Sequence, residues 1–300
     1  MAYLKQQRPE KVTVPSLRLS KERGERLVCL TAYDYPTARI VDEAGTDIIL
    51  VGDSLGNVVL GYENTVPVTL DEMVHHTRAV RRGVTRALLV ADMPYGSYHT
   101  GADDAVRAAI RLVKEAGAEA VKLEGGKSRA EVVKRLVSEE IPVVGHIGLT
   151  PQSVHKLGGF RLQGKTFDAA RALLEDAKSL EAAGACAVVL EVIPREIAQA
   201  ITESIAIPTI GIGAGADCDA QVLVLHDLVG LSFGKSPRFV RAYANLREAM
   251  TDAISRFNED VRAGLYPAET ESYALPAEAA AELNSASGIN ASADADVKSS

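Results

Sequence analysis

The sequence predicts an α/β protein folded as a closed (β/α)8 TIM barrel. Eight short apolar runs recur along the chain, longer amphipathic segments separate them, and polar or acidic residues follow most of the runs. Strands that alternate with helices form parallel sheets, and eight such units over about 210 residues suit a closed barrel. An open doubly wound sheet is the alternative, but it has a single ligand-binding switch point.

The expected strands are the apolar runs themselves, because short runs of branched apolar residues are typical of buried parallel strands. In chain order they cover residues 27–32, 48–51, 87–91, 120–123, 142–145, 187–190, 208–212 and 228–231. The second run ends in Gly52, Asp53 and Ser54, which taken alone is typical of a strand followed by a simple turn.

The expected helices are the amphipathic segments at residues 36–44, 70–82, 102–116, 129–138 and 167–183, with one or two more at 237–264. Four of these segments are followed by glycine, at Gly45, Gly83, Gly117 and Gly184. Glycine just past a helical pattern is the usual C-terminal cap. Its recurrence before successive strands indicates repeated helix-to-strand junctions.

The two ends of the chain differ in composition from the part between them. Residues 1–24 are polar and basic, and we expect a mobile lead-in with room for one short helix. Residues 25–273 form a single barrel domain with C-terminal helices. Residues 274–300 are rich in alanine, serine and aspartate and are expected to be a disordered tail.

Composition argues against several classes of function. The net charge is −7, from 33 basic and 40 acidic residues, and no basic cluster is longer than Arg81-Arg82, so we expect no nucleic-acid partner. No apolar run approaches the ~20 residues that cross a bilayer, so we expect no membrane partner. Cys29, Cys186 and Cys218 have neither metal-site nor disulfide spacing, which favours the reducing cytoplasm.

The polar residues that follow the strands define a candidate site. In a barrel the carboxyl ends of all strands meet at one mouth. Asp53, Asp92, Glu124, His146 and Glu191 each stand at or just after the end of an apolar run. We therefore expect these five side chains to face one another across the mouth.

The fourth run adds a lysine to this group. Side chains alternate along a strand, so Lys122 and Glu124 are expected to point inward while Val121 and Leu123 point toward the helices. A lysine beside a glutamate inside a barrel is hard to explain as core packing. We expect Lys122 to pair with a substrate anion; a surface lysine and a Schiff-base lysine are the alternatives.

Several carboxylates in one dry mouth repel one another unless a cation compensates their charge. Oxygen ligands without clustered histidine or cysteine favour a hard ion, so Mg²⁺ is expected rather than Zn²⁺. Asp53, Asp92 and Glu124 are the predicted ligands, directly or through water. Each of the three taken alone could instead be a helix cap or a turn residue.

Glu191 and His146 are the remaining candidates. Glu191 follows three apolar residues that would leave its carboxylate poorly hydrated, which suits a general base; the alternative is a salt bridge at the end of the sheet. His146 could hydrogen-bond the substrate or be a satisfied core histidine.

Six stretches carry a resemblance to a known family: residues 31–34 (TAYD), 51–56 (VGDSLG), 121–126 (VKLEGG), 145–152 (GHIGLTPQ), 190–191 (LE) and 210–215 (IGIGAG). Together they resemble the ketopantoate hydroxymethyltransferase family, also called 3-methyl-2-oxobutanoate hydroxymethyltransferase. The resemblance runs in order from about residue 12 to Tyr273.

The resemblance implies a barrel of the phosphoenolpyruvate/pyruvate-binding kind. It implies Mg²⁺ on Asp53, Asp92 and Glu124, and a proton acceptor at Glu191. It also implies that 3-methyl-2-oxobutanoate contacts the metal, Asp53, Ser54, Asp92 and Lys122, with Ser54 donating to the substrate carboxylate. The family takes its one-carbon unit from 5,10-methylenetetrahydrofolate, yields 2-dehydropantoate on the route to pantothenate and coenzyme A, and is a cytoplasmic decamer of two pentamers.

Three other functions remain to be weighed. A Mg²⁺-dependent carbon–carbon lyase or phosphonomutase could use the same barrel, although such enzymes commonly place a cysteine in a loop near the fourth or fifth strand. This chain has no cysteine between Cys29 and Cys186. The second is an aldolase that works through Lys122. The third is a barrel that binds a keto acid without catalysis.

Overall fold

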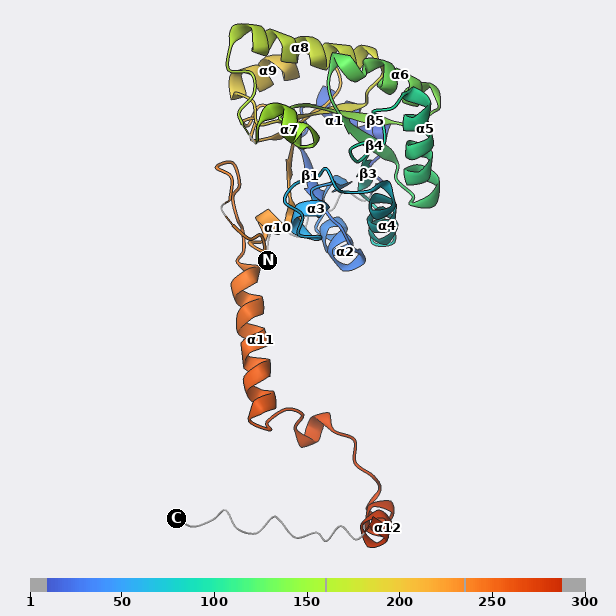
Figure 1. The fold of residues 1–300 in the computed structure, drawn as a ribbon, viewed down its shortest axis with the longest axis vertical. Coiled ribbons are helices and arrows are strands. Elements are labelled where there is room, and N and C mark those ends of the chain that lie inside the picture. The colour runs from blue at the N-terminus through green and yellow to red at the C-terminus, as the bar shows by residue number, and fades with distance from the viewer. Residues whose placement is uncertain (1–9, 160, 235, 288–300) are drawn as a thin grey trace. The chain divides into compact units, whose positions relative to one another are not determined.

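Eight parallel strands close into a barrel in the order of the chain. Figure 1 shows strands of this barrel and the helices around them from one side. This computed structural model describes residues 10–159, 161–234 and 236–287. The contacts divide the chain into two units, Met1–Asn245 and Leu246–Ser300. The strands are β1 (Leu27–Thr31), β2 (Ile48–Val51), β3 (Leu88–Asp92), β4 (Ala120–Glu124), β5 (Val143–Gly148), β6 (Ala187–Glu191), β7 (Thr209–Ile212) and β8 (Ala220–Leu223).

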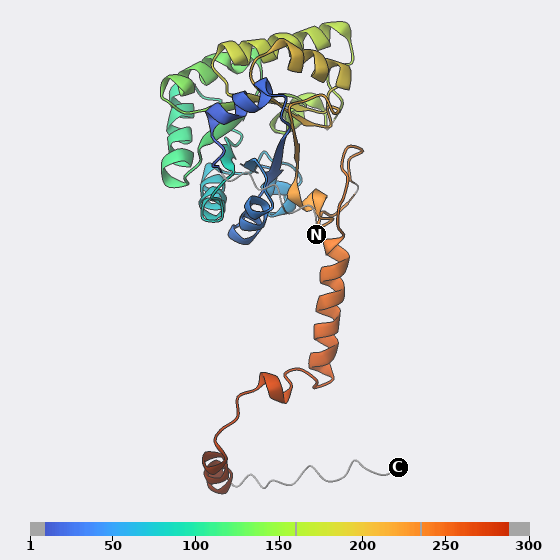
Figure 2. The same cartoon turned by 180° about the vertical axis from the view of Figure 1, so that it is seen from behind.

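Helices surround the strands on the outside, and the reverse view in Figure 2 shows them wrapping the sheet. The longer ones are α2 (Tyr35–Glu43), α4 (Leu70–Arg81), α5 (Ala102–Ile110), α6 (Ala130–Ser138), α8 (Phe167–Ala182) and α9 (Arg195–Ser204). Shorter turns are α3 (Leu55–Val58), α7 (Val154–Leu157), α10 (Leu225–Leu228) and the 3₁₀ turns Lys127–Arg129 and Pro151–Ser153; a π-helical turn, Arg111–Glu115, continues α5. The predicted C-cap glycines Gly45, Gly117 and Gly184 have φ of +90°, +80° and +95°, as a left-handed cap requires.

The alternation on β4 is the local feature that builds the site. Val121 and Leu123 are fully buried in the layer between strands and helices. Ala120 belongs to the separate cluster inside the barrel, and Lys122 and Glu124 share its inward side and line the mouth. The predicted direction of both charged residues is confirmed.

The described part of the lead-in contains a helix. Residues Val14–Glu22 form α1, and Leu17 is fully buried within the interior cluster, beside the first residues of several strands. Lys21 holds the helix down through an ion pair to Asp219 of 2.9 Å. The short helix for which the lead-in has room is therefore present as α1, and one apolar side chain anchors it to the barrel. Residues 1–9 of the lead-in lie outside the described residues.

Two elements of the barrel differ from the prediction. The eighth strand is Ala220–Leu223, which pairs with β7 and β1, and not residues 228–231, which overlap the end of α10. The connection 213–219 from β7 to β8 contains no helix, so the regular spacing of strands is lost there. Helix α9, with Ala198 and Ile201 buried, was not predicted either.

The second unit contains α11 (Leu246–Arg262), the 3₁₀ turn Glu269–Glu271 and α12 (Ala277–Ser287). Within residues 274–300, for which a disordered tail is expected, residues 277–287 form a helix that has no buried side chain, and their alanine, glutamate and leucine favour helix. Residues 288–300 of that prediction lie outside the described residues.

Candidate active site at the barrel mouth

All seven predicted site residues line one cavity of about 840 Å³ at the carboxyl ends of the strands: Asp53, Ser54, Asp92, Lys122, Glu124, His146 and Glu191. They come from the loop after β2 and from strands β3 to β6. The convergence expected from the barrel fold is therefore present.

Lys122 and Asp92 form the central ion pair of the mouth. Lys122 Nζ lies 2.7 Å from Asp92 Oδ1, and both side chains are almost completely buried. Burial opposes the charge on Lys122, but the carboxylates of Asp92, Glu124 and Asp53 outweigh burial and hold the pKa of Lys122 above its usual value. Lys122 is therefore a fixed cation.

His146 connects two carboxylates on the other side of Lys122. Its Nε2 lies 3.0 Å from Glu191 Oε2, and its Nδ1 lies 3.5 Å from Glu124 Oε1. Burial and the Lys122 charge oppose protonation of His146, but hydrogen bonding to Glu124 and Glu191 outweighs them and raises the pKa of His146 to about 9. The imidazole thus carries a proton near neutral pH, facing both acids.

Asp53 is a carboxyl group in an unfavourable environment for its charge. Burial raises the pKa of Asp53 to about 8, and the nearby carboxylates of Asp92 and Glu124 add to the effect. Its backbone N–H donates to Asp92 Oδ2 at 3.0 Å, which brings the two acids together. A positive ligand would relieve the repulsion among them.

Ser54 is held by a tyrosine that the sequence analysis did not select. Tyr33 Oη lies 2.9 Å from Ser54 Oγ, and Tyr33 is fully buried. Tyr33 belongs to the TAYD stretch after β1, so its position just past a strand end was the signal that could have identified it.

Tyr98 and Gln152 are two further residues that sequence reasoning missed. Gln152 Nε2 donates to Asp53 Oδ2 at 2.8 Å, and Tyr98 Oη donates to Gln152 Oε1 at 2.5 Å. Gln152 follows β5 in the GHIGLTPQ stretch, so its place after a strand end pointed to the mouth. Nothing in the local pattern around Tyr98 does so.

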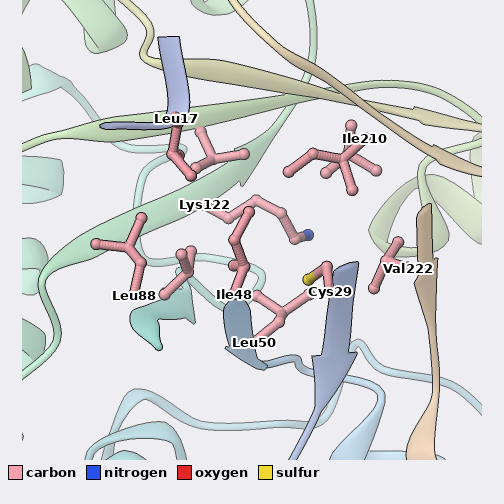
Figure 3. A pocket seen from close by; sticks show the side chains of 11 residues that line it. Leu17, Cys29, Ile48, Leu50, Leu88, Lys122, Ile210 and Val222 are labelled. Carbon is pink, nitrogen blue, oxygen red and sulfur yellow. The ribbon is translucent and has the colours of Figure 1, made fainter. Parts of the chain in front are cut away.

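Below the mouth the barrel interior is apolar, as Figure 3 shows for the side chains around Lys122. Lys122 extends over Leu50 and Cys29 on the inward faces of β2 and β1. Burial raises the pKa of the Cys29 thiol, so it stays neutral. The charged mouth therefore rests on a layer that excludes water.

In this conformation no three His, Cys, Asp or Glu side chains within the described ranges are arranged as a ready-made metal site. Lys122 contacts Asp92 Oδ1, and Gln152 contacts Asp53 Oδ2.

No helix among the described residues is long and apolar enough to cross a membrane.

The fold is similar to that of several solved barrel enzymes. A phosphonopyruvate hydrolase solved with oxalate and Mg²⁺ aligns with a TM-score of 0.55 at 13% identity, over 92% of this chain and 96% of that one. A 2,3-dimethylmalate lyase, described as a PEP mutase/isocitrate lyase superfamily member, aligns with a TM-score of 0.55 at 14% identity. The alignment covers 97% of this chain and 100% of that one. At this identity the likeness shows the fold alone.

Sequence relatives define the family within that class. The family model for ketopantoate hydroxymethyltransferase matches residues 11–269. The chain is 58% identical over 273 residues to a 3-methyl-2-oxobutanoate hydroxymethyltransferase of Koribacter versatilis, covering 91% of this chain and 92% of the relative. It is 54% identical to that of Thermoanaerobacter sp., covering 89% and 97%. The chain belongs to the ketopantoate hydroxymethyltransferase family and so to the hydroxymethyltransferase enzymes.

Proposed function

We propose that this chain transfers a one-carbon unit from 5,10-methylenetetrahydrofolate to 3-methyl-2-oxobutanoate, giving 2-dehydropantoate for pantothenate synthesis. The observation that carries the proposal is the meeting of Glu191, a buried lysine cation and three carboxylates in one mouth. A keto acid needs a cation for its carboxylate, an electrophile for its ketone and a base for the adjacent C–H. The lysine would be the cation, a metal ion on the three carboxylates the electrophile, and Glu191 the base.

Mg²⁺ is the cofactor that these residues fit. Asp53, Asp92 and Glu124 offer only oxygen ligands, and burial together with the neighbouring carboxylates makes the Asp53 charge unfavourable unless a cation compensates it. When bound, Mg²⁺ would polarise the ketone of the substrate and so acidify the neighbouring C3–H. The Mg²⁺ named with the phosphonopyruvate hydrolase belongs to that protein, which shares only its fold with this chain.

Glu191 is the proposed base that removes the C3 proton. Its carboxylate lies at the edge of the mouth, with its side chain 17% exposed, so substrate can reach it. His146 orients it through the 3.0 Å contact between Nε2 and Oε2. A positioned general base contributes about 10²–10⁴-fold to rate. The C3 carbanion then forms a bond to the methylene carbon of the folate. Both C–N bonds to that carbon break, the two folate nitrogens take up protons, and one water molecule supplies the hydroxyl group of 2-dehydropantoate.

Lys122 and Ser54 are the proposed substrate-binding groups. The Lys122 cation would balance the charge on the keto-acid carboxylate or on the enolate oxygen, since it already faces an acidic cluster. Ser54, held by Tyr33, would donate a hydrogen bond to the carboxylate. His146 lines the same cavity and is also a proposed substrate-binding residue.

The alternatives have weaker support. The solved phosphonomutases and lyase share this barrel at only 14–16% identity, whereas the hydroxymethyltransferase relatives reach 52–58%. An aldolase through Lys122 needs a neutral amine, but the pKa of Lys122 is raised by its carboxylate neighbours. A barrel that only binds keto acid would have no use for Glu191 beside His146.

We further propose a cytoplasmic decamer of two pentamers. Helix α11 carries Met250, Ile254, Phe257 and Val261 at helical spacing, each 46–56% exposed in the single chain. An exposed apolar stripe of this kind supports burial against other copies. The three free cysteines agree with a reducing compartment.

The test is a turnover assay with 3-methyl-2-oxobutanoate, 5,10-methylenetetrahydrofolate and Mg²⁺. We expect 2-dehydropantoate, and loss of product when a chelator removes the metal. Absence of product under these conditions would refute the proposal. Borohydride trapping of substrate on Lys122, with activity that survives the chelator, would establish the aldolase instead.

A further inference from the structure

Tyr98 and Gln152 form a buried pair behind two of the mouth carboxylates. Tyr98 lies in the segment after β3 and Gln152 in the 3₁₀ turn after β5, and they are 1% and 4% exposed. The pair lies between Asp53 and Glu124, which belong to different strand ends. Neither residue has a place in the chemistry proposed above.

The hydrogen bonds of this pair can run in one direction only. Tyr98 Oη accepts the N–H of Glu124 at 3.2 Å, and its own proton goes to Gln152 Oε1 at 2.5 Å. The amide nitrogen of Gln152 then faces Asp53 Oδ2 at 2.8 Å and the Met93 carbonyl at 3.0 Å, both of which can accept.

The same glutamine also holds the second carboxylate. Its backbone N–H donates to Glu124 Oε2 at 3.0 Å. Gln152 therefore occupies one oxygen of Asp53 and one of Glu124. The other oxygens are Asp53 Oδ1 and Glu124 Oε1, and the latter also faces His146 Nδ1 at 3.5 Å. Only an amide matches these neighbours, because it accepts from Tyr98 at one end and donates to Asp53 at the other.

We propose that Tyr98 and Gln152 are positioning residues, which hold Asp53 and Glu124 so that each presents one fixed oxygen to a divalent cation. The proposal rests on the cation-binding part of the proposed function. Two carboxylates that repel each other would otherwise turn apart in the free protein, and the cation would have to order them on binding. The pair orders them before the cation arrives.

The test is the affinity of the purified full-length chain for Mn²⁺, followed by the EPR signal of the free ion. Mn²⁺ replaces Mg²⁺ here because both prefer oxygen ligands. We expect Gln152→Met and Tyr98→Phe to raise the Kd about 10–100-fold, the range for residues that orient metal ligands. The matched control is Tyr95→Phe, in the same segment with a side chain that is 48% exposed, and it should keep the wild-type Kd.

Several outcomes would overturn the proposal. Unchanged Mn²⁺ affinity in folded Tyr98→Phe would do so even if Gln152→Met failed to fold. So would the absence of Mn²⁺ binding by the wild-type chain. If both variants weaken Mn²⁺ binding while the wild-type chain makes no 2-dehydropantoate, the positioning role stands and the proposed reaction fails.

Discussion

Two aspartates at opposite ends of the barrel have opposite electrostatics. Asp42, on α2 at the amino-terminal end of the strands, accepts hydrogen bonds from the N–H groups of Thr85, Arg86 and Ala87 at 2.7–3.1 Å. Burial works against its charge, but the hydrogen bonds from Ala87 and Thr85 outweigh burial and lower the pKa of Asp42. Asp53, at the mouth, has few donors, and burial, with a further effect from its acidic neighbours, raises its pKa to about 8.

The comparison shows what each end of the barrel does. At the closed end Asp42 is well supplied with hydrogen-bond donors, and Leu17 of α1 fills the apolar interior. At the mouth, the negative charge exceeds what Lys122 alone can compensate. The ligand-free protein is therefore less stable than it would be without these carboxylates, as is common at functional sites. The predictions that follow test this difference, beginning with the largest effect.

The largest effect is expected at the buried ion pair. Lys122→Met would leave Asp92 buried without its cation, and we expect a loss of about 3–5 kcal/mol in the free energy of unfolding at pH 7. The control is Lys11→Met at the closed end, whose pair with Glu119 is about one-third exposed and should be worth ~0–1 kcal/mol. Urea unfolding of both variants measures the two losses in the free energy of unfolding. Equal losses would contradict the expected difference between the mouth and the closed end.

The apolar closed end should affect stability without affecting chemistry. Leu17→Ala would open a cavity inside the barrel and cost about 2–5 kcal/mol. Leu19→Ala, on the same helix but 47% exposed, should stay within about 0.5 kcal/mol. Activity per folded molecule should be unchanged in both variants. A fall in kcat for folded Leu17→Ala would show that the two ends are coupled.

Removing the strained carboxylate should stabilise the protein. Without divalent cation, Asp53→Asn should raise the free energy of unfolding at pH 8 by about 1 kcal/mol or more, since one unit of pKa shift corresponds to about 1.4 kcal/mol. The same variant should lose the increase in Tm that Mg²⁺ gives the wild type. A destabilised Asp53→Asn variant would refute the idea that charge repulsion dominates at the mouth.

The smallest effect concerns Asp42 and pH. Because its pKa is lower in the folded state, its contribution to stability is complete above the unfolded pKa of about 4 and is lost as the pH falls through the folded value. Urea unfolding between pH 7 and pH 2 should therefore show a shallower loss of stability for Asp42→Asn than for the wild type. Parallel curves would exclude this contribution.

The sequence was informative where one local rule decided the outcome. Period-two alternation on β4 was enough to direct Lys122 and Glu124 inward, and strand ends were enough to bring Asp53, Asp92 and Glu191 to one mouth. These inferences hold because a parallel barrel gives every strand the same direction.

The sequence was misleading where the regular repeat breaks or where contacts are distant. Residues 220–223 were overlooked as β8 because a helix-free connection precedes them and Gln221 interrupts the apolar run. Leu17 gave no sign that α1 would be anchored in the barrel. Tyr98 meets Gln152 across 54 positions of the chain, a pairing that only the closed barrel creates.

Glu191 as the base is the central claim, and hydrogen exchange at C3 of 3-methyl-2-oxobutanoate tests it most directly. The substrate is incubated in D₂O with Mg²⁺ but without folate, and loss of the C3 proton signal is followed by NMR. The account predicts rapid exchange with the wild type, and exchange slowed about 10²–10⁴-fold by Glu191→Gln with substrate binding retained. Exchange at the wild-type rate in Glu191→Gln would contradict it.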